Sequence, residues 1–204
     1  MSEIVTREFI LTEPDRREIL RYAGVRDDGK RYQDLISELL EKARAELKPK
    51  ACYMMLNLTV KGNTVDFGVF SVDSRSLAER LRGCTQAYIF AATVGVGIDR
   101  LISRCGALSQ TAQLVMESVG AERVECLCDL VCEQMSRETE IIGASCVARF
   151  SPGYGDLPLG LQSEIIRLLD TGRKIGVVLN DSLLLTPTKS VTAIVGVKPK
   201  DACM

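Results

Sequence analysis

Residues that could bind a small ligand gather in one short stretch, Arg149 to Pro158, which holds two prolines and two glycines. Arg149 presents a planar fork of donors that suits a carboxylate. Tyr154 adds a ring face and a hydroxyl group. Proline stiffens the backbone and glycine lets a ligand come close. The stretch therefore fits a small zwitterionic ligand with an aromatic part. A tight structural turn with a surface arginine is the alternative, because glycine and proline mark turns.

The segments on either side must position this loop. Residues 145–149 read as a strand that leads into it, and Asp156 is expected to cap the following helix, with Pro158 in its first turn. Two closing strands are expected at 175–180 and 190–197. A long helix at 109–138 has apolar residues at helical spacing and four acids that we expect to face solvent: Glu117, Glu122, Glu125 and Asp129.

The first half of the chain alternates helical and strand patterns. The capping signal Thr12-Glu-Pro-Asp predicts a helix that ends at Tyr22. The other expected elements are a strand at 2–10, helices at 32–47, 74–81 and 98–106, a hairpin of 51–60 with 64–71, and a strand at 86–93. This order predicts an α+β fold with a twisted, mainly antiparallel sheet and flanking helices.

Composition excludes several classes of function. The 204 residues carry a net charge of −1 and are 46% hydrophobic, which suits a normal core and gives no reason to expect nucleic acid or a membrane as partner. The chain has no histidine, which excludes Ser-His-Asp catalysis and histidine-based metal sites. The N-terminus lacks the apolar region of a signal peptide, so we expect a cytoplasmic protein. No catalytic residue is assigned.

Eight cysteines are many for a reducing compartment. Three of them, Cys126, Cys128 and Cys132, lie in the long helix. Cys128 and Cys132 share one helical face, and Cys126 points elsewhere. Sulfurs spread around a helix do not form a four-ligand site without help, so we expect buried small hydrophobic residues and no metal. A metal or cluster site and a redox role are the alternatives.

Four motifs follow one another at spacings that resemble a known family. They are Arg-x-Ser-Pro-Gly-Tyr-Gly-Asp at 149–156, Leu-x-x-Gln at 159–162, Ile-Gly-Val-x-Leu-Asn-x-Ser at 175–182 and Thr-Pro-x-Lys-Ser-Val-x-Ala at 186–193. The family is the activation (reactivation) domain of cobalamin-dependent methionine synthase, in its stand-alone form. The resemblance covers about 85–198 and implies one domain over 1–204, in which 1–84 form a helical and hairpin N-terminal part.

The resemblance implies an S-adenosylmethionine site. Arg149 would hold the methionine carboxylate, the backbone at Phe150 would meet the adenine, and Tyr154 would lie beside the sulfonium. Pro152 and Gly153 belong to the same loop, and Glu125 would reach the amino group. The chain departs from the family on its last strand, where Val195 and Lys198 replace a tyrosine and a histidine.

The implied reaction is the reductive methylation of cob(II)alamin carried by a partner. That partner would be a cobalamin-binding methionine synthase or another corrinoid protein, supplied by an electron donor such as flavodoxin or ferredoxin. A non-catalytic adaptor for a corrinoid methyltransferase is the main alternative, favoured by the missing strand tyrosine. An unrelated S-adenosylmethionine-dependent methyltransferase is a third, although the chain lacks a Rossmann glycine loop after an early strand.

Overall fold

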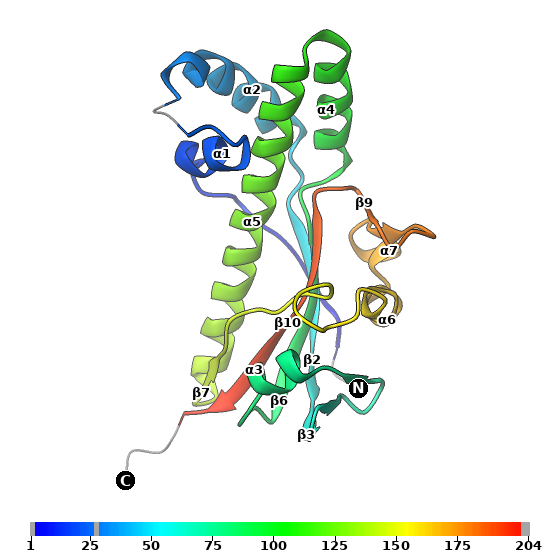
Figure 1. Ribbon diagram of the computed structural model, residues 1–204. Helices are drawn as coiled ribbons and strands as arrows, with labels where there is room; N and C mark the ends of the chain where they lie inside the picture. The colour runs from blue at the N-terminus through cyan, green and yellow to red at the C-terminus, as the bar shows by residue number, and fades with distance from the viewer. Residues whose placement is uncertain (1–2, 27–28, 201–204) are drawn as a thin grey trace.

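A five-stranded antiparallel sheet forms the centre of the computed structural model, which describes residues 3–26 and 29–200 (Figure 1). The strand order is β1-β2-β6-β10-β7. The strands are β1 (Val5–Glu8), β2 (Lys50–Asn57), β6 (Gln86–Thr93), β10 (Ser190–Pro199) and β7 (Ala144–Cys146). The middle strand β6 pairs along its whole length with both β2 and β10. The predicted α+β fold with an antiparallel sheet is confirmed.

Helices cover one face of this sheet. The 32-residue helix α5 runs along it, and the other helices of this face pack around the upper half of α5 (Figure 1). The core on this side joins Tyr53 and Phe90 of the sheet to Leu127 and Val131 of α5. The elements are α1 (Arg16–Tyr22), the 3₁₀ turn η1 (Lys30–Tyr32), α2 (Gln33–Glu46), α4 (Val96–Leu108) and α5 (Gln110–Ile141).

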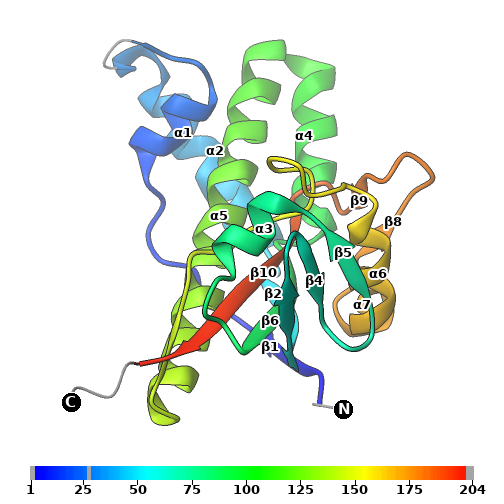
Figure 2. The same ribbon diagram turned by 60° about the horizontal axis from the view of Figure 1, so that its bottom comes forward.

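A second core lies on the opposite face of the sheet. Because side chains alternate along a strand, Met54 and Ile89 point away from α5 and pack with Leu77 and Ile165. Figure 2 shows the small elements that cover this face. They are β3 (Thr59–Lys61), β4 (Thr64–Asp66), β5 (Ser71–Asp73), α3 (Arg75–Arg80), α6 (Leu161–Leu169), α7 (Thr171–Lys174), β8 (Val178–Leu179) and β9 (Leu185–Thr186).

Several predicted boundaries were wrong. The hairpin turn at 61–63 is correct, but of the strand expected before it only β3 pairs with β4. The part up to Asn57 is β2, which lies in the large sheet between β1 and β6. Helix α1 begins at Arg16, after Asp15 as its cap, rather than near Thr12. The strand expected at 145–149 ends at Cys146, and β8 is shorter than the strand expected at 175–180.

Glycine lets α5 pack closely at one point. A Cβ atom at Gly120 would lie 2.9 Å from a methyl carbon of Ile98 in α4 and 3.0 Å from the side chain of Lys189. Real Cβ atoms do not approach that closely, so only glycine fits here without movement of its neighbours. The residue therefore fixes the distance between α5, α4 and the start of β10. No helix in the described part of the chain is both long and apolar enough to cross a membrane.

Candidate functional site

The loop after β7 is attached to β10 at Val147 and at Phe150. The Val147 amide donates to the Gly196 carbonyl at 2.9 Å. The Phe150 amide donates to the Ile194 carbonyl at 2.9 Å, and the Ile194 amide donates back to the Phe150 carbonyl at the same distance. Beyond this bridge the chain turns twice. The Gly153 amide donates to the Leu157 carbonyl at 2.9 Å, and Gly153 has a φ of 90°. The bridge and the turns together fix Arg149 and Tyr154 at opposite ends of one rigid loop.

Asp156 holds the far end of the loop, but not as expected. Its carboxylate accepts hydrogen bonds from the Ser74 hydroxyl at 2.6 Å and from the amides of Arg75 and Ser76 at 2.8 and 3.0 Å. It therefore caps α3, which precedes it by about 80 residues in the chain, and not the helix that follows. The predicted cap of α6 was wrong, because that helix begins only at Leu161, beyond Pro158.

Arg149 is held by two carboxylates of α5. Its Nη2 lies 2.5 Å from Glu125 Oε2, and its Nη1 lies 2.5 Å from Asp129 Oδ1. Burial acts to lower the pKa of Arg149, but the hydrogen bond and charge of Asp129 and the charge of Glu125 outweigh it and raise the pKa. The guanidinium is therefore charged at every relevant pH. Glu125 and Asp129 are two of the four acids that were expected to face solvent, and they pair with the arginine while remaining 43% and 67% exposed.

A groove of about 400 Å³ runs between this ion pair, the loop and the start of β10. Five of the six predicted binding residues line it: Glu125, Arg149, Phe150, Pro152 and Tyr154. The sixth, Gly153, makes the turn that shapes the loop. Tyr154 is 66% exposed, so its ring stands open at the edge of the groove. The groove thus offers a cation, a carboxylate and aromatic rings to one ligand.

Sequence reasoning did not assign Arg80, Gln162 or Thr192 to the groove. The Arg80 guanidinium lies over the Phe150 ring, 5.7 Å from its centroid. Buried Gln162 donates to the Leu183 carbonyl at 3.0 Å and accepts from the Thr192 hydroxyl at 3.3 Å. No local pattern marks Arg80, because it reaches the groove from α3. Gln162 ends one of the quoted motifs, so its signal was present in the sequence.

The last strand contributes different residues from those expected. Val195 is buried and Lys198 is exposed, and neither lines the groove. Its residues Ser190, Val191 and Thr192 do. Val195 and Lys198, which replace the family's tyrosine and histidine, therefore lie farther along β10. The groove borders only the start of that strand.

An acidic cavity of about 540 Å³ lies on the other side of Glu125. It is bounded by α1, the segment before it and α5. Its carboxylates are Glu13, Asp15, Glu18, Glu122, Glu125, Asp129 and Glu133. Glu125 lines the groove as well, so it lies in the wall that separates the groove from the acidic cavity.

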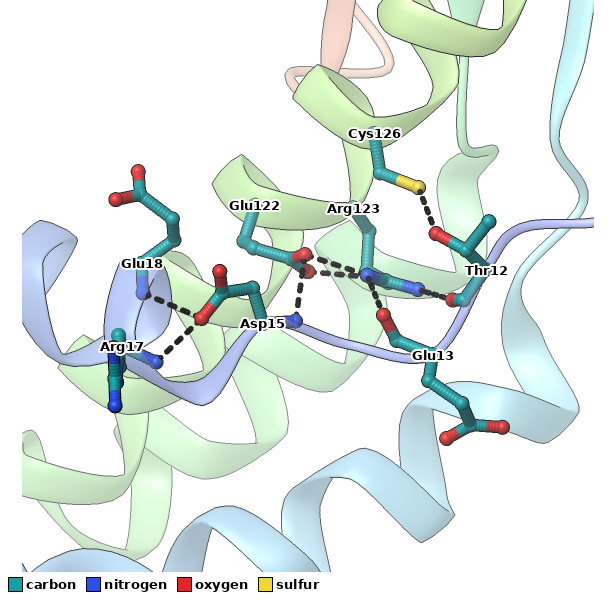
Figure 3. Close-up of polar contacts among 8 residues, drawn as sticks. All are labelled: Thr12, Glu13, Asp15, Arg17, Glu18, Glu122, Arg123 and Cys126. Carbon is teal, nitrogen blue, oxygen red and sulfur yellow. Dashed lines mark hydrogen bonds and ion pairs between the residues drawn. The ribbon is translucent and has the colours of Figure 1, made fainter.

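Glu122, which lines this cavity, forms a buried ion pair with Arg123 (Figure 3). Arg123 donates to Glu122 through Nε and Nη2, each at 2.5 Å, and through Nη1 to the Thr12 carbonyl at 2.6 Å. Glu122 also accepts from the Asp15 amide at 3.1 Å. The prediction that Glu122 faces solvent was wrong, since it is 6% exposed. The pair clamps the segment before α1 onto α5, one turn from Glu125.

Of the three cysteines of α5 that were expected to be buried, Cys128 is buried, whereas Cys126 and Cys132 are only half-buried. Cys128 is buried in the core, and burial raises the pKa of its thiol. Cys132 lines a cavity of about 520 Å³ together with Cys146 and Arg149, and burial raises the pKa of its thiol as well. Cys126 points elsewhere, toward the Thr12 hydroxyl at 3.3 Å. Within residues 3–26 and 29–200, no cluster of three or more Cys, Asp or Glu side chains is arranged to hold a metal ion.

Comparison with known proteins gives a match in structure but not in sequence. No family model matches the chain. No curated protein matches it either. Among solved structures, the fold is similar to that of "Crystal Structure of the MetH Reactivation Domain bound to AdoHcy". The TM-score is 0.69 at 14% identity, and the match covers 100% of this chain and 81% of that chain. The chain thus has the fold of a methionine synthase reactivation domain.

Proposed function

We propose that this chain binds S-adenosylmethionine and serves as a reactivation subunit for a cobalamin-dependent methionine synthase. The observation that carries the proposal is the groove that joins Arg149, Glu125 and Tyr154 in a chain with this fold. The similar domain of known structure is bound to AdoHcy, which is S-adenosylmethionine without its transferable methyl group. The motif at 149–156 supports the same assignment.

Each end of the ligand has a chemical counterpart in the groove. The Arg149 fork suits the carboxylate, and Glu125, 2.5 Å from that fork, suits the ammonium group. The exposed Tyr154 ring suits the sulfonium through a cation–π contact. Because the Phe150 amide already donates to Ile194, the groups that Phe150 offers an adenine are its ring and the free lone pair of its carbonyl.

The chain's own role would be to bind and orient the methyl donor. Reduced cobalamin, carried by the partner, supplies the nucleophile that accepts the methyl group. No residue of this chain needs to move a proton for that transfer, which agrees with a chain that has no histidine. The groove is wide open at Tyr154, so the sulfonium methyl group would face outward, toward a docked partner.

The partner proposed is a cobalamin-binding methionine synthase, or another corrinoid protein, in the cytoplasm. The electron would come from a donor such as flavodoxin or ferredoxin. A pull-down from the native host tests this part of the proposal. We expect the characteristic visible absorption of a corrinoid in the eluate, and an eluate that holds bound proteins but no corrinoid would contradict it.

Isothermal titration with S-adenosylmethionine tests the binding site. Loss of a charged hydrogen bond in Arg149→Ala should weaken binding by about 1.5–3 kcal/mol, or about 10- to 150-fold. Arg137→Ala is the matched control, because Arg137 is an exposed arginine of α5 with a single weak ion pair to Glu133 at 3.9 Å. Equal affinity of the two variants would contradict the assignment of Arg149.

An adaptor without S-adenosylmethionine binding is the second candidate. The observation that favours it is the pairing of Arg149 with two carboxylates of its own chain. The same titration separates the two candidates, because an adaptor would retain the corrinoid partner in the pull-down while showing no heat of binding with S-adenosylmethionine.

A further inference from the structure

Both terminal nitrogens of Arg149 already have a carboxylate partner. Nη2 faces Glu125 and Nη1 faces Asp129, each at 2.5 Å. A ligand carboxylate that binds an arginine side-on needs two N–H donors pointing the same way. Arg149 has five N–H donors, and a ligand carboxylate that takes Nη1 and Nη2 together competes with both acids for them.

The two acids are not equivalent. Glu125 lines the groove and its side chain is 43% exposed. Asp129 lies outside the groove, lines the acidic cavity, and is 67% exposed. An exposed ion pair is weak, because water replaces the lost contact. Asp129 is therefore the partner that Arg149 gives up at the lower cost.

We propose that Asp129 is a specificity-determining residue that occupies Arg149 in place of a ligand carboxylate and leaves when the ligand binds. Glu125 stays beside the guanidinium and receives the ligand ammonium group. The inference rests on the proposed function and adds to it a reason why the site prefers some ligands over others. A ligand with both a carboxylate and an ammonium group can replace Asp129, whereas an adenosine thioether without the amino-acid part has nothing to exchange.

The proposal predicts that removing the charge of Asp129 and removing the charge of Glu125 have opposite effects on the affinity for AdoHcy. Asp129→Asn removes the competitor and should tighten binding of AdoHcy. Glu125→Gln removes the counter-ion of the ammonium group and should weaken it. A purely structural role for the three-residue ion pair would make both substitutions harmful. General electrostatics alone would make both substitutions act in the same direction on a given ligand.

Isothermal titration on the full chain tests the inference with AdoHcy and with 5′-methylthioadenosine, which lacks the amino-acid part. Asp129→Asn should bind AdoHcy about two- to fivefold more tightly than the unmodified protein, the range of an exposed ion pair. Its affinity for 5′-methylthioadenosine should not change. Glu133→Gln is the matched control, since it removes one charge from the same helix and cavity and should change neither affinity by more than about twofold.

The outcomes separate this inference from the proposed function. Binding of AdoHcy that depends on Arg149 but is unchanged or weakened in Asp129→Asn overturns the inference and leaves the proposed function standing. Equal tightening of both ligands by Asp129→Asn also overturns it, because the gain would then be unrelated to the carboxylate. No binding of AdoHcy by any of the variants overturns both. Asp129→Ser, which also lacks the charge, should shift the affinity in the same direction as Asp129→Asn.

Discussion

The Ser74 hydroxyl donates to the Asp156 carboxylate across 2.6 Å, although 82 positions separate the two residues in the chain. This bond joins the loop at 149–158 to the first turn of α3, from which Arg80 reaches the groove. One carboxylate therefore supports both the loop and a helix that borders the site. Its removal should affect stability and the site together.

Asp156→Ala should lower the melting temperature and loosen the loop. The variant loses the acceptor for the Ser74 hydroxyl and for two backbone amides at the start of α3. Hydrogen exchange should become faster at the amides of Arg75 and Ser76. Asp181→Ala, at an exposed acid in the β8–β9 turn, should change neither quantity. Unchanged exchange at Ser76 in Asp156→Ala would contradict the capping role.

The same carboxylate should make stability depend on acid pH. The hydrogen bonds from the Ser74 hydroxyl and the Ser76 amide hold the pKa of Asp156 well below its usual range. An acid whose pKa is lowered by folding stabilises the fold above its unfolded pKa, about 3.9, and loses this contribution as the pH falls. The difference in melting temperature between the unmodified protein and Asp156→Asn should therefore shrink from pH 6 to pH 3. A constant difference would argue against a charged cap.

Breaking the buried ion pair should be costly. Arg123→Met leaves the Glu122 carboxylate buried without its cation, and we expect a loss of about 3 kcal/mol or more in the free energy of unfolding. Urea denaturation measures it. The double variant Glu122→Gln/Arg123→Met should lose less than the sum of the single variants, because the two changes remove one shared interaction. Strict additivity would show that the two side chains act independently.

A side chain at Gly155 should destabilise the fold. Its φ is 55°, and a Cβ atom would lie 2.6 Å from the Ser76 hydroxyl. Gly155→Ala should cost about 1–2 kcal/mol for the left-handed backbone and more for the displaced serine. Gly143→Ala is the control, because Gly143 has a φ of 71° and no atom within 4 Å of the added carbon. Equal losses in urea denaturation would mean that the contact with Ser76 is unimportant.

The sequence predicted well those features that depend on neighbours in the chain. The apolar spacing predicted the long helix that became α5, and the apolar run at 86–93 predicted β6 with its observed bounds. The fold class followed from the order of such elements. These signals are local, so they can be read from the sequence without knowledge of the tertiary structure.

Features set by distant contacts were missed. Nothing near Asp156 indicates that it caps α3, and nothing near Glu122 indicates that the segment from Thr12 to Asp15 buries it. The division of the expected hairpin at Asn57 depends on β6, which arrives 29 residues later. Arg149 was singled out by its chemistry and Glu125 by the family resemblance, but only the fold shows that they form an ion pair.

A crystal structure of the protein with AdoHcy tests the central claim most directly. We expect the ligand along the groove, its carboxylate on Arg149 in the place of Asp129, its ammonium group on Glu125 and its sulfur beside Tyr154. Density for the ligand at any other place, with Arg149 still held by both acids, would contradict the account.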